Sequence, residues 1–152
     1  MNPTPADWPR FSSAVVYADA AAAIDWLCRA FGFAVRIKVL GADGRVRHSE
    51  LEYGDGLLMV AQESPDDARP SMRALRAPAS VGGANTQSLM FFVDDADAHC
   101  AHARAQGARI VDEPSTHDHG AEYWADRSYA ALDPEGHLWW VTQRVRNPPA
   151  RA

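Results

Sequence analysis

The alternation of hydrophobic and polar positions predicts a strand, a helix and three further strands between residues 11 and 62. Phe11–Tyr17 is rich in residues that favour β-strands. Asp19 is suited to cap a helix, and apolar side chains then recur at helical spacing as far as Phe31, just before Gly32. Three stretches with the pattern of strands follow, separated by glycine-containing turns: 34–40, 45–53 and 57–61.

The same order of elements returns between residues 86 and 145. A strand-like stretch, 86–93, precedes Asp95 in a capping position, and helical spacing follows until Gly107. Three more strands are predicted, with a polar loop around residues 117–120 after the first of them: 108–112, 123–132 and 137–143. The two caps and the two terminal glycines lie in near register, so a duplicated unit is the simplest explanation.

Residues 63–85 interrupt the repeat with prolines, paired glycines and scattered charges, which are typical of a surface linker or a mobile loop. We therefore predict a single α+β domain over residues 1–152, with one βαβββ module at about 11–62 and a second at about 86–145. Each helix would cover one face of its sheet and leave the other open. The two modules would then form an incomplete barrel around one cleft.

Composition excludes several classes of function. The 152 residues carry a net charge of −5 at pH 7 without a continuous basic stripe, which disfavours nucleic-acid binding. No stretch is apolar for the length of a membrane span, and residues 1–10 lack the apolar core of a signal peptide. Cys28 and Cys100 fit small core residues in a reducing compartment. We expect a cytoplasmic protein that contacts neither nucleic acid nor membrane.

Short motifs follow the predicted elements in order: Tyr17-Ala18-Asp19, Arg29-Ala30-Phe31-Gly32, Tyr123-Trp124-Ala125-Asp126-Arg127 and Leu132-Asp133-Pro134-Glu135-Gly136-His137. In order and spacing they resemble the vicinal oxygen chelate superfamily, which includes glyoxalase I, bleomycin-resistance proteins and extradiol dioxygenases. The segment His48-Ser49-Glu50-Leu51 is similar to the branch labelled glyoxalase-like or PhnB-like. The resemblance implies a small-molecule ligand and a homodimer.

The resemblance also implies where a metal would bind. Metal-dependent members carry ligands in the first and last strands of each half, at positions that correspond here to Ser12, Met59, Ser88 and Trp140. A hydroxyl is a poor ligand, a thioether suits soft metals, and an indole is no ligand. We therefore expect that the metal centre is absent and that no cofactor is bound.

His48, Glu50 and Glu52 share one face of a predicted strand. A carboxylate beside an imidazole could form a proton-transfer pair in the cleft, with His48 and Glu50 as the candidate catalytic residues. In the competing interpretation, the two glutamates pair with Arg36 and Lys38 across the sheet as ordinary cross-strand charges.

Two further histidine groups are candidate metal sites. His117-Asp118-His119 offers two imidazoles and a carboxylate on a predicted loop, and a solvated loop is the competing interpretation. His99 and His102 lie three residues apart on the second helix without an evident third ligand, and we interpret them as surface residues.

Aromatic side chains are concentrated near the last two strands. Trp139 and Trp140 must point to opposite faces of a strand, so at most one of them lines the cleft, and the spacing selects Trp140. Its ring would stack on a planar or apolar ligand; a place in the core or in a dimer interface is the alternative.

The function predicted first is metal-independent binding of a small, partly aromatic molecule, as in antibiotic-sequestering bleomycin-resistance proteins. Sequestration needs affinity and no catalytic group. His48 and Glu50 would serve as polar anchors in a pocket with these lining residues: Ser12, Met59, Ser88, Phe92, Trp124 and Trp140. The alternative is an enzyme, a lyase, isomerase or dioxygenase relative that uses His48 and Glu50 or a non-standard metal site. A third possibility is a domain that mainly dimerises or binds another protein.

Overall fold

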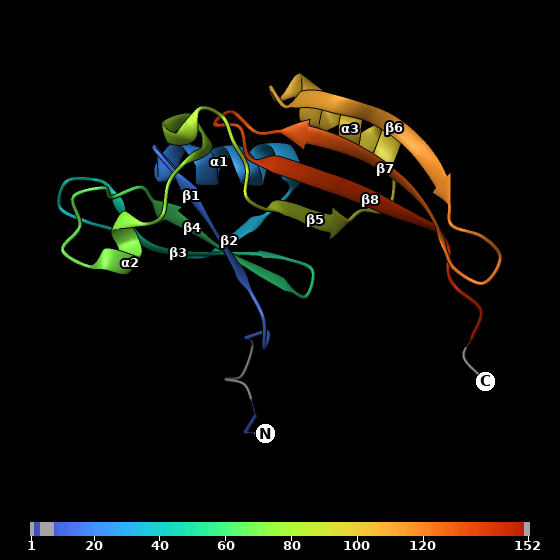
Figure 1. Ribbon diagram of the computed structural model, residues 1–152, viewed down its shortest axis with the longest axis horizontal. Helices are drawn as coiled ribbons and strands as arrows, with labels where there is room; N and C mark the ends of the chain where they lie inside the picture. The colour runs from blue at the N-terminus through green and yellow to red at the C-terminus, as the bar shows by residue number, and fades with distance from the viewer. Residues whose placement is uncertain (1, 4–7, 151–152) are drawn as a thin grey trace. The chain divides into compact units, whose positions relative to one another are not determined.

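A computed structural model describes residues 2–3 and 8–150, and it has the predicted α+β fold (Figure 1). The chain divides into two compact units, one up to Ala84 and the other from Asn85 onward. Part of the N-terminal stretch judged to lack a signal peptide, residues 1 and 4–7, lies outside the described residues. No helix in the described part of the chain is long and apolar enough to cross a membrane.

The first unit contains a βαβββ module whose four strands form one sheet in the order β1-β4-β3-β2. β1 runs parallel to β4, and the other neighbouring pairs are antiparallel. The elements are β1 (Ser13–Tyr17), α1 (Ala20–Phe31), β2 (Ala34–Leu40), β3 (Val46–Tyr53) and β4 (Gly56–Gln62).

Helix α1 begins and ends at the predicted residues. The Asp19 carboxylate accepts a hydrogen bond from the backbone N–H of Ala22 at 3.0 Å, and Gly32 ends the helix at a φ of 84°, which favours glycine. The buried side of α1 includes Leu27. On the sheet, Val15 and Val60 are buried in neighbouring strands, so the core of this unit lies between the helix and one face of the sheet.

The segment between β4 and β5 carries α2 (Pro70–Arg73) and a short 3-10 helix, η1 (Pro78–Val81). Its start is anchored by Glu63, which is only 7% exposed and accepts hydrogen bonds from the side chain of Arg76 and, at 2.6 Å, from Ser80 Oγ. Arg45 Nη2 donates to the backbone oxygen of Glu63 at 2.8 Å. Burial by itself favours the protonated acid, but the hydrogen bonds outweigh it and hold the pKa of Glu63 below its usual value.

The second unit repeats the module, with its sheet in the order β5-β8-β7-β6. Its elements are β5 (Ser88–Phe92), α3 (Ala96–Ala105), β6 (Arg109–Asp118), β7 (Ala125–Leu132) and β8 (Leu138–Arg146). Asp95 caps α3 through the backbone N–H of Ala98 at 2.9 Å. Trp139 and Tyr129 are fully buried, and Phe91 lies between His99 of α3 and Trp139, so the core again lies under the helix.

The extent of β6 corrects the sequence interpretation. The strand was predicted to end near Asp112, but it continues to Asp118, so His117 and Asp118 pair with β7 instead of lying in a loop. Irregular pairing between Ile110 and Ser115 breaks the alternation that marks a strand. Two hydrogen bonds from Arg146 to Asp118, at 2.6 and 2.9 Å, support the extended end.

The turn before β8 depends on Asp133, which is 4% exposed. Its Oδ1 accepts hydrogen bonds from the backbone N–H groups of Glu135, Gly136 and His137 at 3.1, 2.9 and 3.0 Å. Its Oδ2 accepts the indole N–H of Trp139 at 3.0 Å. One carboxylate therefore holds both the turn and the largest core side chain of the second unit.

Replacement of Asp133 by Ala removes the carboxylate that accepts these four hydrogen bonds, three from the turn and one from a buried indole. We expect the free energy of unfolding to fall by about 3 kcal/mol. Urea denaturation followed by circular dichroism measures it. Asp55→Ala, at an exposed turn, is the control and should change stability little. A loss below about 0.5 kcal/mol in Asp133→Ala would contradict this role.

Glu63 makes a pH-dependent contribution to stability. Because its pKa is lower in the folded chain than the ordinary value of 4.5, the contribution is fully present above that value and is lost as the pH falls through the folded value. The urea midpoint of the wild type should fall more steeply than that of Glu63→Gln between about pH 5 and about pH 3. Glu122→Gln, at an exposed position, should keep the wild-type slope, and a Glu63→Gln slope as steep as the wild type would refute the assignment.

Candidate functional site

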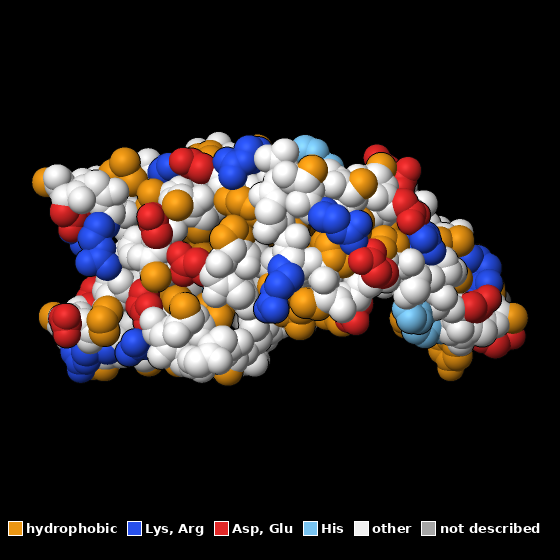
Figure 2. Space-filling view, turned by 90° about the horizontal axis from the view of Figure 1, so that it is seen from above, with side chains coloured by type: hydrophobic (Ala, Val, Ile, Leu, Met, Phe, Trp, Pro, Cys, Tyr) orange, Lys and Arg blue, Asp and Glu red, His pale blue; other side chains and the backbone are white. Residues whose placement is uncertain are grey.

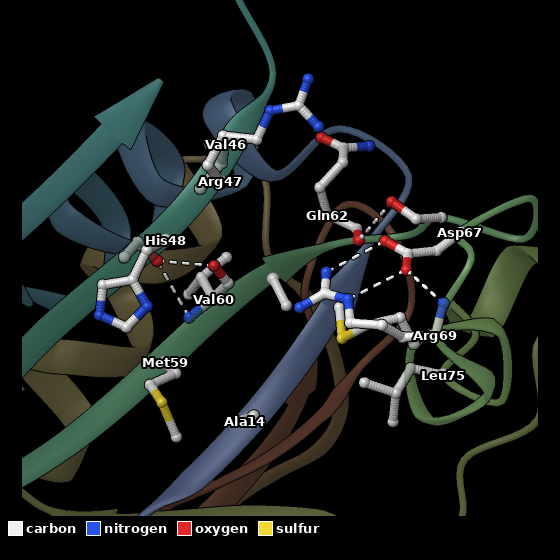
Figure 3. A pocket seen from close by; sticks show the side chains of 14 residues that line it. Ala14, Val46, Arg47, His48, Met59, Val60, Gln62, Asp67, Arg69 and Leu75 are labelled. Carbon is white, nitrogen blue, oxygen red and sulfur yellow. Dashed lines mark hydrogen bonds and ion pairs between the residues drawn. The ribbon is translucent and has the colours of Figure 1, made fainter. Parts of the chain in front are cut away.

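Each sheet has one face turned away from its helix, which we call the helix-free face. In the first unit a hollow of about 290 Å³ opens beside this face, between β1, β3, β4 and the segment after β4. Figure 3 shows His48 and Met59 at one end of the hollow and Asp67 with Arg69 at the other. Of the predicted site residues, the hollow therefore brings together His48 and Met59. Ser12 is half-buried, one residue before β1 begins, and is not among the residues that line the hollow.

Glu50 is 5% exposed, and it contacts two of the three side chains considered as its partners, His48 and Arg36. His48 Nε2 lies 2.8 Å from Glu50 Oε1, and Arg36 Nε lies 3.4 Å from Oε2. Oε2 accepts no hydrogen bond from the described residues. The contact of Glu50 with His48 and its cross-strand contact with Arg36, which the two interpretations treated as alternatives, are therefore both present. The expected pairing of Lys38 with a glutamate of β3 is wrong, because Lys38 contacts Asp25 of α1 at 3.1 Å, and the register of β2 shifts between Val35 and Ile37.

The far wall of the hollow was not anticipated from the sequence, which marks this segment only by prolines and arginines. Asp67 Oδ1 accepts hydrogen bonds from the Arg69 side chain at 3.0 Å and from its backbone N–H at 2.8 Å. These bonds lower the pKa of Asp67 to about 2, so the carboxylate stays ionised. Met72 and Leu75 complete an amphipathic wall opposite the sheet.

The helix-free face of the second unit carries aromatic side chains. Phe92 is 45% exposed and Trp124 is 37% exposed, and the Arg144 guanidinium carbon lies 5.3 Å and 5.7 Å from their ring centroids. Arg144 Nε also donates to Asp126 Oδ1 at 2.5 Å. These side chains form what we call the Arg144 cluster: Phe92, Trp124, Asp126 and Arg144. Sequence reasoning selected Phe92 and Trp124 but missed Arg144, whose role depends on the register of β7 and β8.

Trp140 and Ser88 lie on the same helix-free face. Trp139 is buried toward α3, so its neighbour Trp140, which is half-buried, points to the other side of β8. Trp140 is the register partner of Met90, and Ser88 is exposed two residues earlier on β5. The helix-free face of the second unit therefore holds four of the residues predicted to bind ligand: Ser88, Phe92, Trp124 and Trp140.

The remaining histidines have other partners. His117 Nε2 lies 2.8 Å from Ser115 Oγ, and His119 packs on Trp124. His99 Nδ1 lies 2.7 Å from Tyr129 Oη, so its interpretation as a surface residue is wrong, although His102 is exposed. Within residues 2–3 and 8–150, no three His, Cys, Asp or Glu side chains are grouped as a metal site would require.

Charge on the surface is mixed. On the face shown in Figure 2, Lys and Arg side chains stand beside Asp and Glu side chains, and no continuous basic stripe crosses the view. Ion pairs of the described residues include Arg104 with Glu113 and Arg127 with Asp97.

Comparisons with known proteins identify the family. Residues 12–141 match the sequence profile of the Glyoxalase/Bleomycin resistance protein/Dioxygenase superfamily. An uncharacterised protein of Mycobacterium bovis is 31% identical over 138 residues, which is 91% of this chain and 85% of that protein. The structure of TioX from Micromonospora sp. ML1 has a TM-score of 0.65 and 29% identity, and the match covers 90% of this chain and 100% of that one.

The structure of TnmS3, an antibiotic binding protein from Streptomyces sp. CB03234, shares the fold at a TM-score of 0.60 and 21% identity, over 90% of this chain and 97% of that one. The duplicated βαβββ modules agree with these matches. The proteins for which the superfamily is named bind or convert small molecules. This chain belongs to the glyoxalase/bleomycin resistance protein/dioxygenase superfamily, the vicinal oxygen chelate proteins.

Proposed function

We propose that the chain binds a small, partly aromatic molecule and that it does so without a bound metal. The observation that carries the proposal is the pair of rings, Phe92 and Trp124, left 45% and 37% exposed on a helix-free face. Exposed aromatic rings that are held by a sheet offer a rigid surface for stacking. The description of TnmS3 as an antibiotic binding protein supports sequestration as the role of this binding.

The residues at the expected metal positions support the metal-independent part of the proposal. They offer two hydroxyls, a thioether and an indole: Ser12, Ser88, Met59 and Trp140. Such a set does not fit a divalent transition-metal ion such as Zn²⁺, whose usual protein ligands are imidazole, carboxylate or thiolate. Trp140 instead adds a further ring to the face that carries Phe92.

The branch of the superfamily, the cellular location and the oligomeric state are part of the same proposal. We propose that the chain belongs to the PhnB-like branch and that it acts as a cytoplasmic homodimer. The exposed apolar side chains of the edge strand β2 support a dimer, since Val35, Ile37 and Val39 are 44%, 39% and 47% exposed.

Tryptophan fluorescence tests the binding site. A panel of planar antibiotics and aromatic metabolites should contain ligands that quench the wild-type emission, and Trp124→Phe and Trp140→Phe should each lose part of that quenching because these indoles lie on the helix-free face. Trp26→Phe is the matched control, because Trp26 is 6% exposed within the core. Binding of a confirmed ligand with unchanged quenching in both site variants would place the ligand elsewhere.

One observation favours a second candidate function, an enzyme. His48 contacts the buried carboxylate of Glu50 at 2.8 Å and lines the hollow of the first unit. When Nε2 donates to Glu50, Nδ1 is left as an acceptor that can take a proton from a substrate, and the carboxylate stabilises the resulting imidazolium. A lyase or isomerase would need such removal of a proton from its substrate.

Metal analysis and turnover separate the two candidates. Protein purified without chelators should contain no stoichiometric metal, and Zn²⁺, Ni²⁺ or Mn²⁺ should not raise its melting temperature strongly. One bound metal per chain, with a thermal shift lost in His48→Ala, would contradict metal-independent binding. Conversion of a bound compound that stops in His48→Gln while its binding persists would establish the enzyme instead.

A further inference from the structure

The Arg144 cluster contains a guanidinium with unused hydrogen-bonding capacity. Of the five N–H groups of an arginine, Nε donates to Asp126 and Nη1 makes one long contact of 3.4 Å with Asn147 Oδ1. Nη2 donates to none of the described residues. The side chain is 31% exposed, so these free N–H groups are within reach of a ligand.

The position of this guanidinium is well defined. Asp126, whose side chain is 14% exposed, contacts Nε, while Phe92 and Trp124 lie within 5.3 Å and 5.7 Å of the guanidinium carbon. Aromatic rings near a guanidinium restrict its orientation and exclude part of its water. The free donors of Arg144 are therefore held beside the two rings on which a planar ligand would stack.

A second arginine of the same sheet, Arg127, lacks this arrangement. Arg127 has the same 31% side-chain exposure, but its Nε and Nη2 both donate to Asp97, at 2.5 and 2.7 Å, and Nη1 contacts Thr116. Each of its three nitrogens therefore has a partner, and within the described residues the Arg127 guanidinium makes no cation–π contact.

We infer that the Arg144 cluster is a binding subsite for an aromatic molecule that carries an anionic oxygen, a carboxylate or a phenolate, on the ring system. The rings of Phe92 and Trp124 take the planar part, and the N–H groups of Arg144 Nη2 donate to the oxygen. This inference rests on the proposed function and names the class of ligand. Because Asp126 balances the charge of Arg144, the selectivity comes from short-range hydrogen bonds and should depend only weakly on salt.

Two probes of one ring system test the charge preference: 2-naphthoate, and 2-naphthamide as its neutral counterpart. Calorimetric titration of the full chain should give a dissociation constant about tenfold lower for 2-naphthoate, since hydrogen bonds to charged groups are the stronger ones. Arg144→Gln should remove the preference, and Arg127→Gln should keep it. Because Arg144→Gln leaves Asp126 half-buried without its partner, Asp126→Asn/Arg144→Gln serves as a second variant that removes both charges.

Equal affinity of the wild type for both probes, or a carboxylate preference that survives in both Arg144 variants, would overturn the subsite. The outcomes also separate the inference from the proposed function. If aromatic compounds of the fluorescence panel bind with no dependence on Arg144, the inference fails alone. If neither the two probes nor any aromatic compound binds, the proposed function fails, and the subsite fails with it.

Discussion

A four-stranded sheet has two faces, and each module of this chain supplies one helix, which covers only one of them. The core forms where the helix lies: Val15, Leu51 and Val60 are buried in the first unit, and Tyr129 and Trp139 in the second. The opposite face of each sheet has no helix of its own module. A sheet covered on one side only must either carry polar side chains on the other or bind something there. The candidate functional residues described above, His48 with Glu50 in the first unit and the Arg144 cluster in the second, lie on these helix-free faces.

The two helix-free faces have different chemistry. The first carries the contact of His48 with the buried Glu50 beside a hollow, an arrangement suited to proton transfer or to a polar anchor. The second carries exposed rings around Arg144, an arrangement suited to stacking and to an oxygen acceptor. A repeated fold has therefore acquired two unlike surfaces. That the two faces line a single cleft stays a prediction.

Local signals in the sequence were sufficient to predict the two helices that have a capping aspartate. Asp19 and Asp95 cap their helices as expected, since a capping carboxylate acts on the next few residues. Long-range contacts were harder to predict from the sequence. The extension of β6 to Asp118, for example, depends on irregular pairing with β7. The partner of Lys38 depends on a register shift, and the anchoring of Glu63 by Ser80 joins residues far apart in sequence. No periodicity encodes such contacts, so the Arg144 cluster could be predicted only in part, through its aromatic members.

The central claim is that an aromatic ligand binds the helix-free face of the second unit. Nuclear magnetic resonance of the indole N–H groups tests it directly, because the five tryptophans report separately. On addition of a ligand that quenches fluorescence, the signals of Trp124 and Trp140 should shift, while those of the buried Trp26 and Trp139 should stay near their original positions. Shifts confined to Trp26 or Trp139, or saturation of the protein without a shift at Trp124 or Trp140, would contradict the account.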